Sequence, residues 1–322
     1  MAGSYINTLH SFFSYGVSRY TGIPLRPPLP PAISVELTNI CNLSCPECAT
    51  GAGLLNRRKG MIDINLAGKI AEELSGTVLS SYLYFQGEPM LHPQFFEIVR
   101  LFRKMNPVIS TNGHFLNAEN CTRLASSGLK KIIISFDGIS ADTYIKYRQG
   151  GDHDKVKEGI LELVKAVRKS RSEPTVEIQF LIGKHNEQDL GAVMRFAKSM
   201  GTSFKIKSMQ VLDNSRANEW ITKDLRRSRF RIDDGKIIPM HTPRSGCFRM
   251  WSAAVITIDG DVVPCCYDKN AEFSMGNMNS HTFTEIWNGT EYNSFRTIVM
   301  HSREEIAICK ACPQGRRLTF RT

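Results

Sequence analysis

The chain has 322 residues, of which 42% are hydrophobic and 22% are charged, and its net charge is +10. This composition is ordinary for a soluble enzyme. The chain is also long enough to bury roughly three quarters of the surface that it exposes when unfolded. Apolar runs fall far short of the ~20 residues that a membrane-spanning helix needs, and residues 1–20 lack the pattern of a signal peptide. We therefore expect a cytoplasmic protein without a transmembrane segment.

Basic residues concentrate at 57–59, 223–231 and 316–321. Such a surface favours acidic partners, namely nucleic acid, an anionic membrane or a flavodoxin-like electron donor. A solvated basic face without a dedicated partner is equally compatible with the pattern. Because no RNA-binding motif accompanies the charge, a nucleic-acid partner is not expected.

Residues 1–32 form a separate N-terminal segment. A proline-rich stretch, 27–31, ends it in an extended lead-in. Before it, large apolar residues recur at helical spacing, which predicts an amphipathic helix that packs on the following domain. Binding to a membrane surface or to a partner is the alternative. The residues of this stripe are Tyr5, Ile6, Leu9, Phe12, Phe13, Val17 and Tyr20.

Strands and helices alternate from residue 33 to residue 208, which predicts a parallel sheet with right-handed crossovers and ligands at the carboxyl ends of its strands. We predict strands at 33–38, 81–85, 107–110, 131–136, 175–182 and 203–208. We predict helices at 64–75, 93–104, 117–127, 153–169 and 187–200.

Three cysteines follow the first predicted strand with the spacing C-x3-C-x2-C, at Cys41, Cys45 and Cys48. Thiolates are the ligands that iron–sulfur clusters and zinc select. A [4Fe–4S] cube usually takes four cysteines, so three would leave one iron open to a substrate. Zinc would need a fourth ligand, and no His or Cys lies between Cys48 and His92, although a structural zinc loop stays an alternative.

Polar and small residues also follow the next three predicted strands. The clusters are Gln86-Gly87-Glu88-Pro89, Ser110-Thr111-Asn112-Gly113 and Ser135-Phe136-Asp137-Gly138. Each alone is compatible with ordinary turn chemistry. Three in succession, on the same edge of the sheet as the cysteines, together predict a binding rim.

A second set of cysteines occupies the last 76 residues, after a charged segment, 213–246, that we interpret as a linker. A predicted hairpin with an Asp259-Gly260 turn can bring Cys247 and Cys265 together. Four cysteines would close a site for [4Fe–4S] or zinc. The set comprises Cys247, Cys265, Cys266, Cys309 and Cys312.

The first cysteine motif resembles the signature of the radical SAM enzymes. The resemblance implies an α/β fold with a partial (β/α)6 barrel over 33–212 and a [4Fe–4S] cluster on Cys41, Cys45 and Cys48, whose open iron binds S-adenosylmethionine (SAM). It further implies cleavage of SAM to a 5′-deoxyadenosyl radical. The position before the last cysteine is often aromatic in the family and is Glu47 here.

The same resemblance gives roles to the rim residues. Gly87, Glu88 and Pro89 look like the motif that meets the methionyl amine of SAM. Ser110 and Asn112 match the positions for ribose and carboxylate, and Ser135 and Asp137 match a ribose-facing strand end. Arg148 resembles the arginine that pairs the methionyl carboxylate, a contact that suits a bidentate guanidinium.

Residues 247–322 resemble the SPASM/Twitch auxiliary-cluster domain. The resemblance rests on Cys247, the Gly260-x4-Cys265 step, the 285–288 stretch and Cys309-x2-Cys312, and it implies one auxiliary [4Fe–4S] cluster. The glycine step favours Cys265 over Cys266 as a ligand, although the choice between adjacent sulfurs stays open.

We therefore expect a radical SAM oxidoreductase or maturase that oxidatively modifies a peptide or a small molecule and receives electrons from a flavodoxin- or ferredoxin-like donor. Asp213, after the last predicted strand, is a conceivable general base or an ordinary turn residue. The alternatives are an iron–sulfur or zinc scaffold that binds an acidic partner, and an RNA-modifying enzyme.

Overall fold

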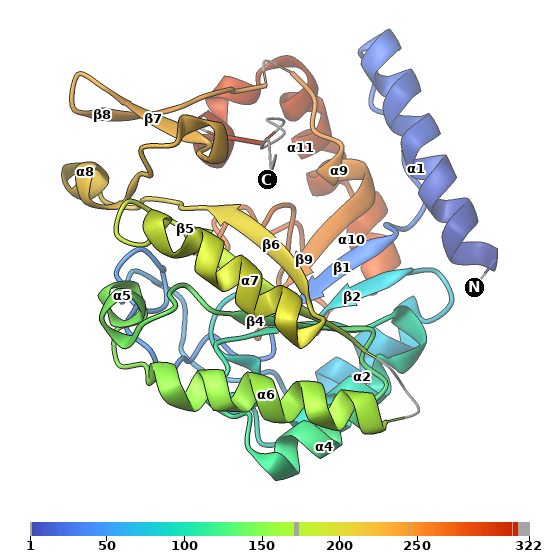
Figure 1. Ribbon diagram of the computed structural model, residues 1–322. Helices are drawn as coiled ribbons and strands as arrows, with labels where there is room; N and C mark the ends of the chain where they lie inside the picture. The colour runs from blue at the N-terminus through green and yellow to red at the C-terminus, as the bar shows by residue number, and fades with distance from the viewer. Residues whose placement is uncertain (1, 171–173, 244, 311, 315–322) are drawn as a thin grey trace. The chain divides into compact units, whose positions relative to one another are not determined.

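The computed structural model describes residues 2–170, 174–243, 245–310 and 312–314 (Figure 1). The chain forms two compact units that interleave along the sequence. The first comprises Met1–Ile40, Leu55–Val108 and Pro243–Lys310, and the second comprises Cys41–Leu54, Ile109–Thr242 and Ala311–Thr322. The division of the sequence at residues 213 and 246 that we expected stays a prediction. None of the described helices is long and apolar enough to cross a membrane.

The sheet of the first unit is built around β1, which pairs in parallel with β2 on one side and with β9 on the other. β10 pairs antiparallel with β9 across the expected Asp259-Gly260 turn, in which Gly260 has a φ of 88°. The predicted hairpin is therefore present, and it extends the sheet of β1. The bounds are β1 (Ala32–Val35), β2 (Ser80–Tyr82), β9 (Ala253–Ile256) and β10 (Val262–Val263).

Two α-helices of the first unit, α2 and α10, start at side-chain caps. Asp63 accepts hydrogen bonds from the first backbone amides of α2, and Thr282 and Glu285 form a capping box at α10. The helix α11 was not predicted from the sequence. The bounds are α1 (Ala2–Thr21), α2 (Ile64–Leu74), η1 (Pro89–Leu91), α3 (Phe95–Leu101), η2 (Arg103–Met105), α9 (Arg249–Ser252), α10 (Phe283–Asn288), α11 (Thr290–His301), η6 (Arg303–Glu305) and α12 (Ala307–Lys310).

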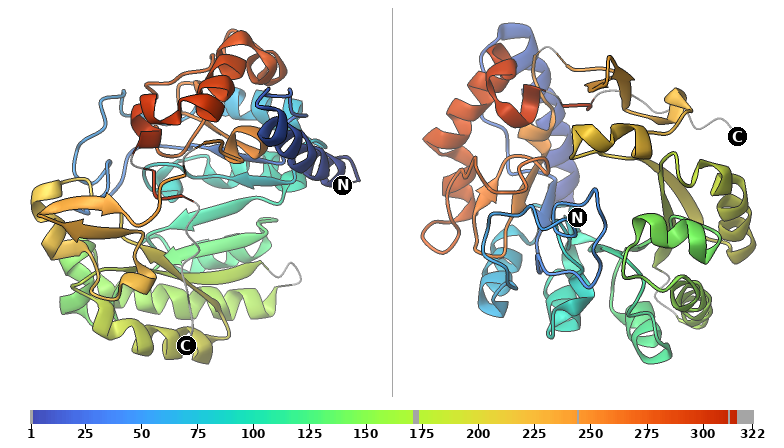
Figure 2. Two further views of the ribbon diagram at one scale, coloured as in Figure 1. Left: turned by 90° about the horizontal axis from the view of Figure 1, so that it is seen from above. Right: turned by 90° about the vertical axis from the view of Figure 1, so that its left-hand side faces the viewer.

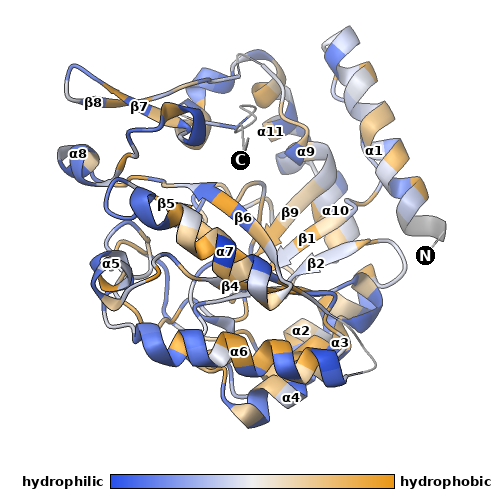
Figure 3. Cartoon of the chain, in the orientation of Figure 1, coloured by the Kyte–Doolittle hydropathy of each residue, from blue (hydrophilic) through white to orange (hydrophobic). Residues whose placement is uncertain are grey.

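The second unit continues β3 (Val108–Thr111) from Ile109 and carries the strand order β3-β4-β5-β6, with β4, β5 and β6 parallel. Its helices alternate with these strands, and α6 shows the polar and apolar banding of a helix with one buried face (Figure 3). The strands are β4 (Lys131–Ser135), β5 (Thr175–Ile182) and β6 (Ser203–Ser208). The helices are α4 (Ala118–Ser126), α5 (Ala141–Tyr147), α6 (His153–Lys169), η3 (Glu187–Asp189) and α7 (Leu190–Met200).

The segment that we interpreted as a linker is ordered in the second unit. It contains a hairpin whose turn residues, Asp234 and Gly235, both have positive φ, as the right-handed twist of a two-residue hairpin turn requires. The elements are η4 (Asn214–Arg216), α8 (Ala217–Trp220), η5 (Leu225–Arg227), β7 (Phe230–Asp233) and β8 (Lys236–Pro239).

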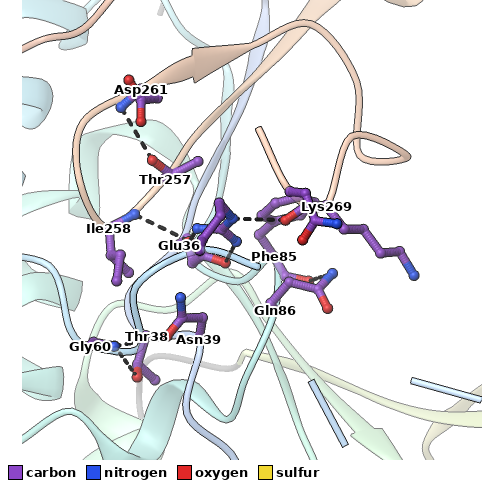
Figure 4. A network of polar contacts seen from close by, with 12 residues as sticks. Glu36, Thr38, Asn39, Gly60, Phe85, Gln86, Thr257, Ile258, Asp261 and Lys269 are labelled. Carbon is purple, nitrogen blue, oxygen red and sulfur yellow. Dashed lines mark hydrogen bonds and ion pairs between the residues drawn. The ribbon is translucent and has the colours of Figure 1, made fainter. Parts of the chain in front are cut away.

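A polar clasp in the first unit joins residues 36–39, just before the cysteine loop, to residues 57–62, just after it (Figure 4). The Thr38 hydroxyl donates to the carbonyl of Gly60 at 2.7 Å. The Asn39 side chain donates to the carbonyl of Arg58 at 2.8 Å and accepts from the amide of Gly60 at 2.9 Å. Both ends of the cysteine-bearing excursion are therefore fixed to each other.

The centre of this clasp is a buried ion pair. Arg57 donates through two nitrogens to the two carboxylate oxygens of Glu36, each at 2.8 Å, and the two side chains are 7% and 0% exposed. The same groups bind the auxiliary segment, because Glu36 accepts from the amide of Ile258 and Arg57 donates to the carbonyl of Lys269. One bidentate pair thus holds β1, the end of the cysteine loop and the β9–β10 region together.

We predict that Arg57→Met destabilises the protein by about 3–5 kcal/mol, because it leaves the Glu36 carboxylate buried without its cation. Arg58→Met is the matched control, since the neighbouring pair of Arg58 with Asp259 is 62% and 33% exposed and should contribute less than about 1 kcal/mol. Chemical denaturation of both variants measures the difference. Equal losses would show that the buried pair does not have this role.

Candidate active site

The cysteine loop, 41–54, belongs to the second unit and packs on one apolar cluster. Cys45 is buried in this cluster, and Cys41 and Cys48 pack against it. The loop closes tightly, because a Cβ on Gly51 would lie 2.5 Å from the amide nitrogen of Cys45, so only glycine fits there. The other buried members of the cluster are Leu43, Tyr147, Met209 and Trp220.

Arg148 lies beside the cysteines and is held by a carboxylate. Its Nε donates to Asp137 Oδ2 at 2.6 Å, and its Nη1 lies 3.9 Å from Cys45 Sγ. Asp137 is fully buried and its other oxygen accepts from the amide of Leu181 at 2.6 Å. Burial raises the pKa of Cys45 to about 11, and the Arg148 cation opposes that rise. A fixed positive charge therefore stands next to the thiol.

A hydrogen-bonded relay also supports the loop from β3. The amide of Asp152 donates to Nε2 of His114 at 2.8 Å, which assigns the ring proton to Nδ1, and Nδ1 then donates to Oδ1 of Asn112 at 3.0 Å. The Asn112 amide group donates in turn to Asn42 Oδ1 at 2.8 Å and lies 3.8 Å from Cys41 Sγ. Burial lowers the pKa of His114, in keeping with a neutral ring.

Glu47, the residue that departs from the family pattern, ties the loop to the end of β6. Its carboxylate accepts from the amide of Leu212 at 2.6 Å, and the residue is 4% exposed. Sequence reasoning gave Glu47 no structural role. The structure gives it one, because a charged acceptor takes a backbone donor that an aromatic residue would leave unpaired.

Gly87, Glu88 and Pro89 belong to the first unit, where they pack on the backbone that leads into Cys41. The amide of Glu88 donates to the carbonyl of Ile40 at 2.9 Å, and the Glu88 side chain caps η1, in which Pro89 is the first residue. Gly87 has a φ of 71°, and a Cβ there would contact the carbonyl oxygen of Thr38 and would lie 2.7 Å from that of Ile40.

The remaining predicted residues have varied surroundings in the second unit. Ser110 is half-buried on β3, and Ser135 is buried on β4 opposite Gln179. Asp213 is exposed and caps η4, with hydrogen bonds from Ser215 that lower its pKa and so make it a weaker base. The turn interpretation of Asp213 therefore has the stronger structural basis.

Sequence reasoning missed an aromatic wall beside the cysteine loop. The rings of Tyr147, Trp220 and His185 form a triangle: His185 lies 6.1 Å from Tyr147 and 5.2 Å from Trp220 by ring centroids, and Tyr147 lies 5.7 Å from Trp220. Burial lowers the pKa of His185 to about 4, and among the described residues neither ring nitrogen has a hydrogen-bond partner. Of these three aromatic residues, only Tyr147 could have been found from the sequence, because it belongs to the Y-R-Q-G-G stretch, 147–151, that also contains Arg148.

Three cysteines of the second set interact electrostatically with one arginine, Arg249, in the first unit. Cys266 is the largest cause of the raised pKa of Arg249. Cys265 and Cys247 raise this pKa further, and burial of the guanidinium opposes the rise. The thiols of Cys265 and Cys266 also interact with each other. Arg249 is therefore within electrostatic reach of three of the cysteines, whereas the joining of Cys247 and Cys265 by the hairpin stays a prediction. Cys309 is buried on α12 of the same unit, and Cys312 is buried in the segment assigned to the second unit.

The donor chemistry of both sets fits iron–sulfur clusters. Within the described residues, no three His, Cys, Asp or Glu side chains gather closely enough to hold a single metal ion. Ligands of a cube each bind a different iron, and so stand further apart than the four ligands of one zinc ion. Both sets also have an arginine nearby, namely Arg148 next to Cys45 and Arg249 near Cys247, Cys265 and Cys266, which suits the negative charge of such a cluster.

We predict that Gly87→Ala destabilises the protein more than Gly76→Ala, because both residues have positive φ but only Gly87 faces backbone atoms. Gly76 has a φ of 91° and no atom within 4 Å of an added Cβ, so its replacement carries only backbone strain of about 1–2 kcal/mol. Thermal unfolding of the two variants tests this order. Equal midpoints would contradict the close approach to residues 38–40.

Two family models match the chain. The radical SAM superfamily model matches residues 35–197, just over half of the chain, and the SPASM iron–sulfur cluster-binding domain matches residues 247–313. The AdoMet-dependent heme synthase of Methanosarcina barkeri (strain Fusaro / DSM 804) is 25% identical over 300 residues, which cover 81% of this chain and 83% of that protein.

Solved structures show the same fold. BtrN in complex with AdoMet and 2-DOIA superposes with a TM-score of 0.55 at 20% identity, over 88% of this chain and 92% of BtrN. Streptococcus suis SuiB bound to the precursor peptide SuiA gives a TM-score of 0.65 at 14% identity, over 92% of this chain and 72% of SuiB. These likenesses confirm the expected α/β, barrel-type fold. The chain belongs to the radical SAM superfamily and is an enzyme whose cofactors are SAM and a [4Fe–4S] cluster, with auxiliary iron–sulfur clusters in its SPASM segment.

Proposed function

We propose that the protein carries out an oxidative modification of a peptide or a small molecule that begins with abstraction of a substrate hydrogen. In this proposal Cys41, Cys45 and Cys48 hold the SAM-binding cluster. The observation that carries it is the packing of all three cysteines on one apolar cluster beside Arg148, which is fixed by Asp137. When bound, the reduced cluster and SAM supply a 5′-deoxyadenosyl radical.

The residues around the loop would orient SAM in two ways. Arg148 keeps Nη2 and the second proton of Nη1 for the methionyl carboxylate, because its Nε donates to Asp137 and its Nη1 also contacts Cys45 Sγ. Asp137 is then a positioning residue, although the ribose contact that we first expected for it stays a prediction. Asn112 is held by His114 and Asn42, so its amide is preset at the edge of the cysteine loop.

The auxiliary cysteines are the reason for proposing an oxidative modification. Cys247, Cys265, Cys309 and Cys312 would hold one auxiliary cluster, which can accept the electron that a substrate radical loses. Arg249 supports this role, because a cation beside thiolates stabilises added negative charge. Asp213 could still take the accompanying proton, although its exposure and lowered pKa favour another base.

The relatives support both substrate classes. BtrN was solved with 2-DOIA, and the chain covers 92% of it. SuiB was solved with a precursor peptide, and the chain covers 72% of it. The basic run 223–231, with Arg216 before it, gives little support to a nucleic-acid substrate, because four of these arginines already have carboxylate partners nearby. These arginines are Arg216, Arg226, Arg227 and Arg231.

The test is anaerobic reconstitution followed by iron analysis and dithionite-dependent formation of 5′-deoxyadenosine. We expect about eight irons per chain in the wild type, the content of two cubes. Cys45→Ala should lose about four irons and all nucleoside formation. Cys309→Ala should also lose about four irons but keep nucleoside formation, because SAM cleavage depends on the first cluster only.

Two results would contradict the proposal. One is zinc in place of iron at Cys41, Cys45 and Cys48. The other is nucleoside formation that survives in Cys45→Ala or disappears in Cys309→Ala, since either would assign SAM cleavage to a different site. If neither result is found, the purified product from a candidate peptide or small-molecule substrate decides the substrate class.

A further inference from the structure

The N-terminal helix α1 packs on its unit with its polar side. Ser11 and Ser18 are 0% exposed and Ser14 is 9% exposed. Tyr15 joins this buried side by contacting Phe248 and Trp251 near α9, and the Arg19 side chain donates to Ser245. The small serines allow the helix to lie close to the body of the unit. Most of the apolar stripe therefore does not pack on the unit as expected, although Phe12, at one edge of the stripe, stacks on Phe248 at a centroid distance of 4.4 Å.

The opposite side of α1 is apolar and exposed. The six large residues on it fall within about a 120° arc at 100° per residue. Figures 1 and 2 show α1 along the edge of its unit, beside α9 and α11, with one side facing away from them. The exposed fractions are Tyr5 58%, Ile6 51%, Leu9 68%, Phe12 58%, Phe13 69% and Tyr20 93%.

This orientation reverses the usual rule for surface helices, in which the apolar side is buried. Single exposed apolar residues need no explanation, but a continuous patch marks a binding surface. The patch continues beyond the helix, because Ile23 is 65% exposed and Leu25 is 39% exposed. The buried serine hydroxyls are satisfied within the helix itself, since Ser11 donates to the carbonyl of Asn7 and Ser18 to that of Ser14. The helix is anchored on its unit by the Asn7 side chain, which donates to the carbonyl of Thr77, and by the contacts of Tyr15 and Arg19, so its apolar side is left to bind something else.

The charge and the order of side chains on this surface identify the occupant. Residues 1–35 contain no Asp or Glu, whereas Arg19 and Arg26 are both exposed. Two of the exposed side chains are tyrosines, Tyr5 and Tyr20. Tyrosine, with an apolar ring and a polar hydroxyl, is enriched where hydrocarbon meets water, and a cationic segment is attracted to anionic headgroups.

We propose that the exposed face of α1 binds the surface of an anionic lipid bilayer, with the helix axis in the plane of the interface. Its apolar side chains enter the boundary between headgroups and acyl chains. The serine face stays docked on α9, so the rest of the first unit is held at the membrane surface. The proposal does not depend on the chemistry proposed above.

The test is sedimentation of the full-length, reconstituted protein with vesicles of phosphatidylcholine and phosphatidylglycerol. We expect the wild type to pellet with these vesicles, and to pellet less with phosphatidylcholine alone. Leu9→Ser with Phe13→Ser should lower the partition coefficient about tenfold or more, because two large apolar side chains no longer leave water. Both residues are exposed, so the thermal midpoint should stay that of the wild type.

The matched control is Leu101→Ser with Leu161→Ser, which removes two exposed apolar residues from α3 and α6 and should leave vesicle binding unchanged. Failure of the wild type to pellet with vesicles would overturn the proposal. An equal loss in the control would do the same. So would a dimer in sedimentation velocity that Leu9→Ser with Phe13→Ser dissociates without any vesicle binding, since the face would then pair two copies of the chain.

Discussion

The buried ion pair between Glu36 and Arg57 is the constraint on which the candidate site depends. It closes the base of an excursion that begins at Cys41 and ends near Leu54. A loop of this length would sample many conformations if its ends were free, and closing the ends removes much of that entropy. Because Glu36 also accepts from Ile258, the same carboxylate links the loop base to the auxiliary segment.

A second buried ion pair, Arg148 with Asp137, lies in the candidate site itself, beside Cys45. Its function is orientation, because Asp137 has no exposed surface and fixes the guanidinium through Nε. A buried cation beside thiols is costly unless it is paired, and the pairing with Asp137 provides that compensation. Arg249 has an equivalent place beside Cys247, Cys265 and Cys266. Each cysteine set therefore has its own positive neighbour.

The sequence predicted the regular elements of the alternating region well. The helix 153–169 and the strands 175–182 and 203–208 were correct to the residue, because caps and apolar spacing are local signals. The helix α11 was missed, since its burial pattern is set by tertiary neighbours. The cysteine spacings also predicted iron–sulfur clusters and the radical SAM family, because they are read directly from the sequence.

Other features could not be predicted from local pattern. The bond from Leu212 to Glu47 joins residues 165 positions apart, and the pairing of Asp137 with Arg148, 11 positions apart, depends on how α5 lies after β4. The orientation of α1 was wrong for a related reason. An apolar stripe normally faces the core, but here the small serines allow a closer approach, and the stripe faces outward.

The most direct test of the central claim is electron paramagnetic resonance of dithionite-reduced Cys309→Ala, in which only the cluster of the loop 41–48 should remain. We expect added SAM to change the spectrum of this cluster, because SAM would bind its open iron. A further Arg148→Met change should keep the iron content and weaken the response to SAM at least tenfold, as for loss of a bidentate carboxylate contact worth about 1.5–3 kcal/mol. A reduced cluster whose spectrum does not respond to SAM, or responds equally without Arg148, would contradict the account.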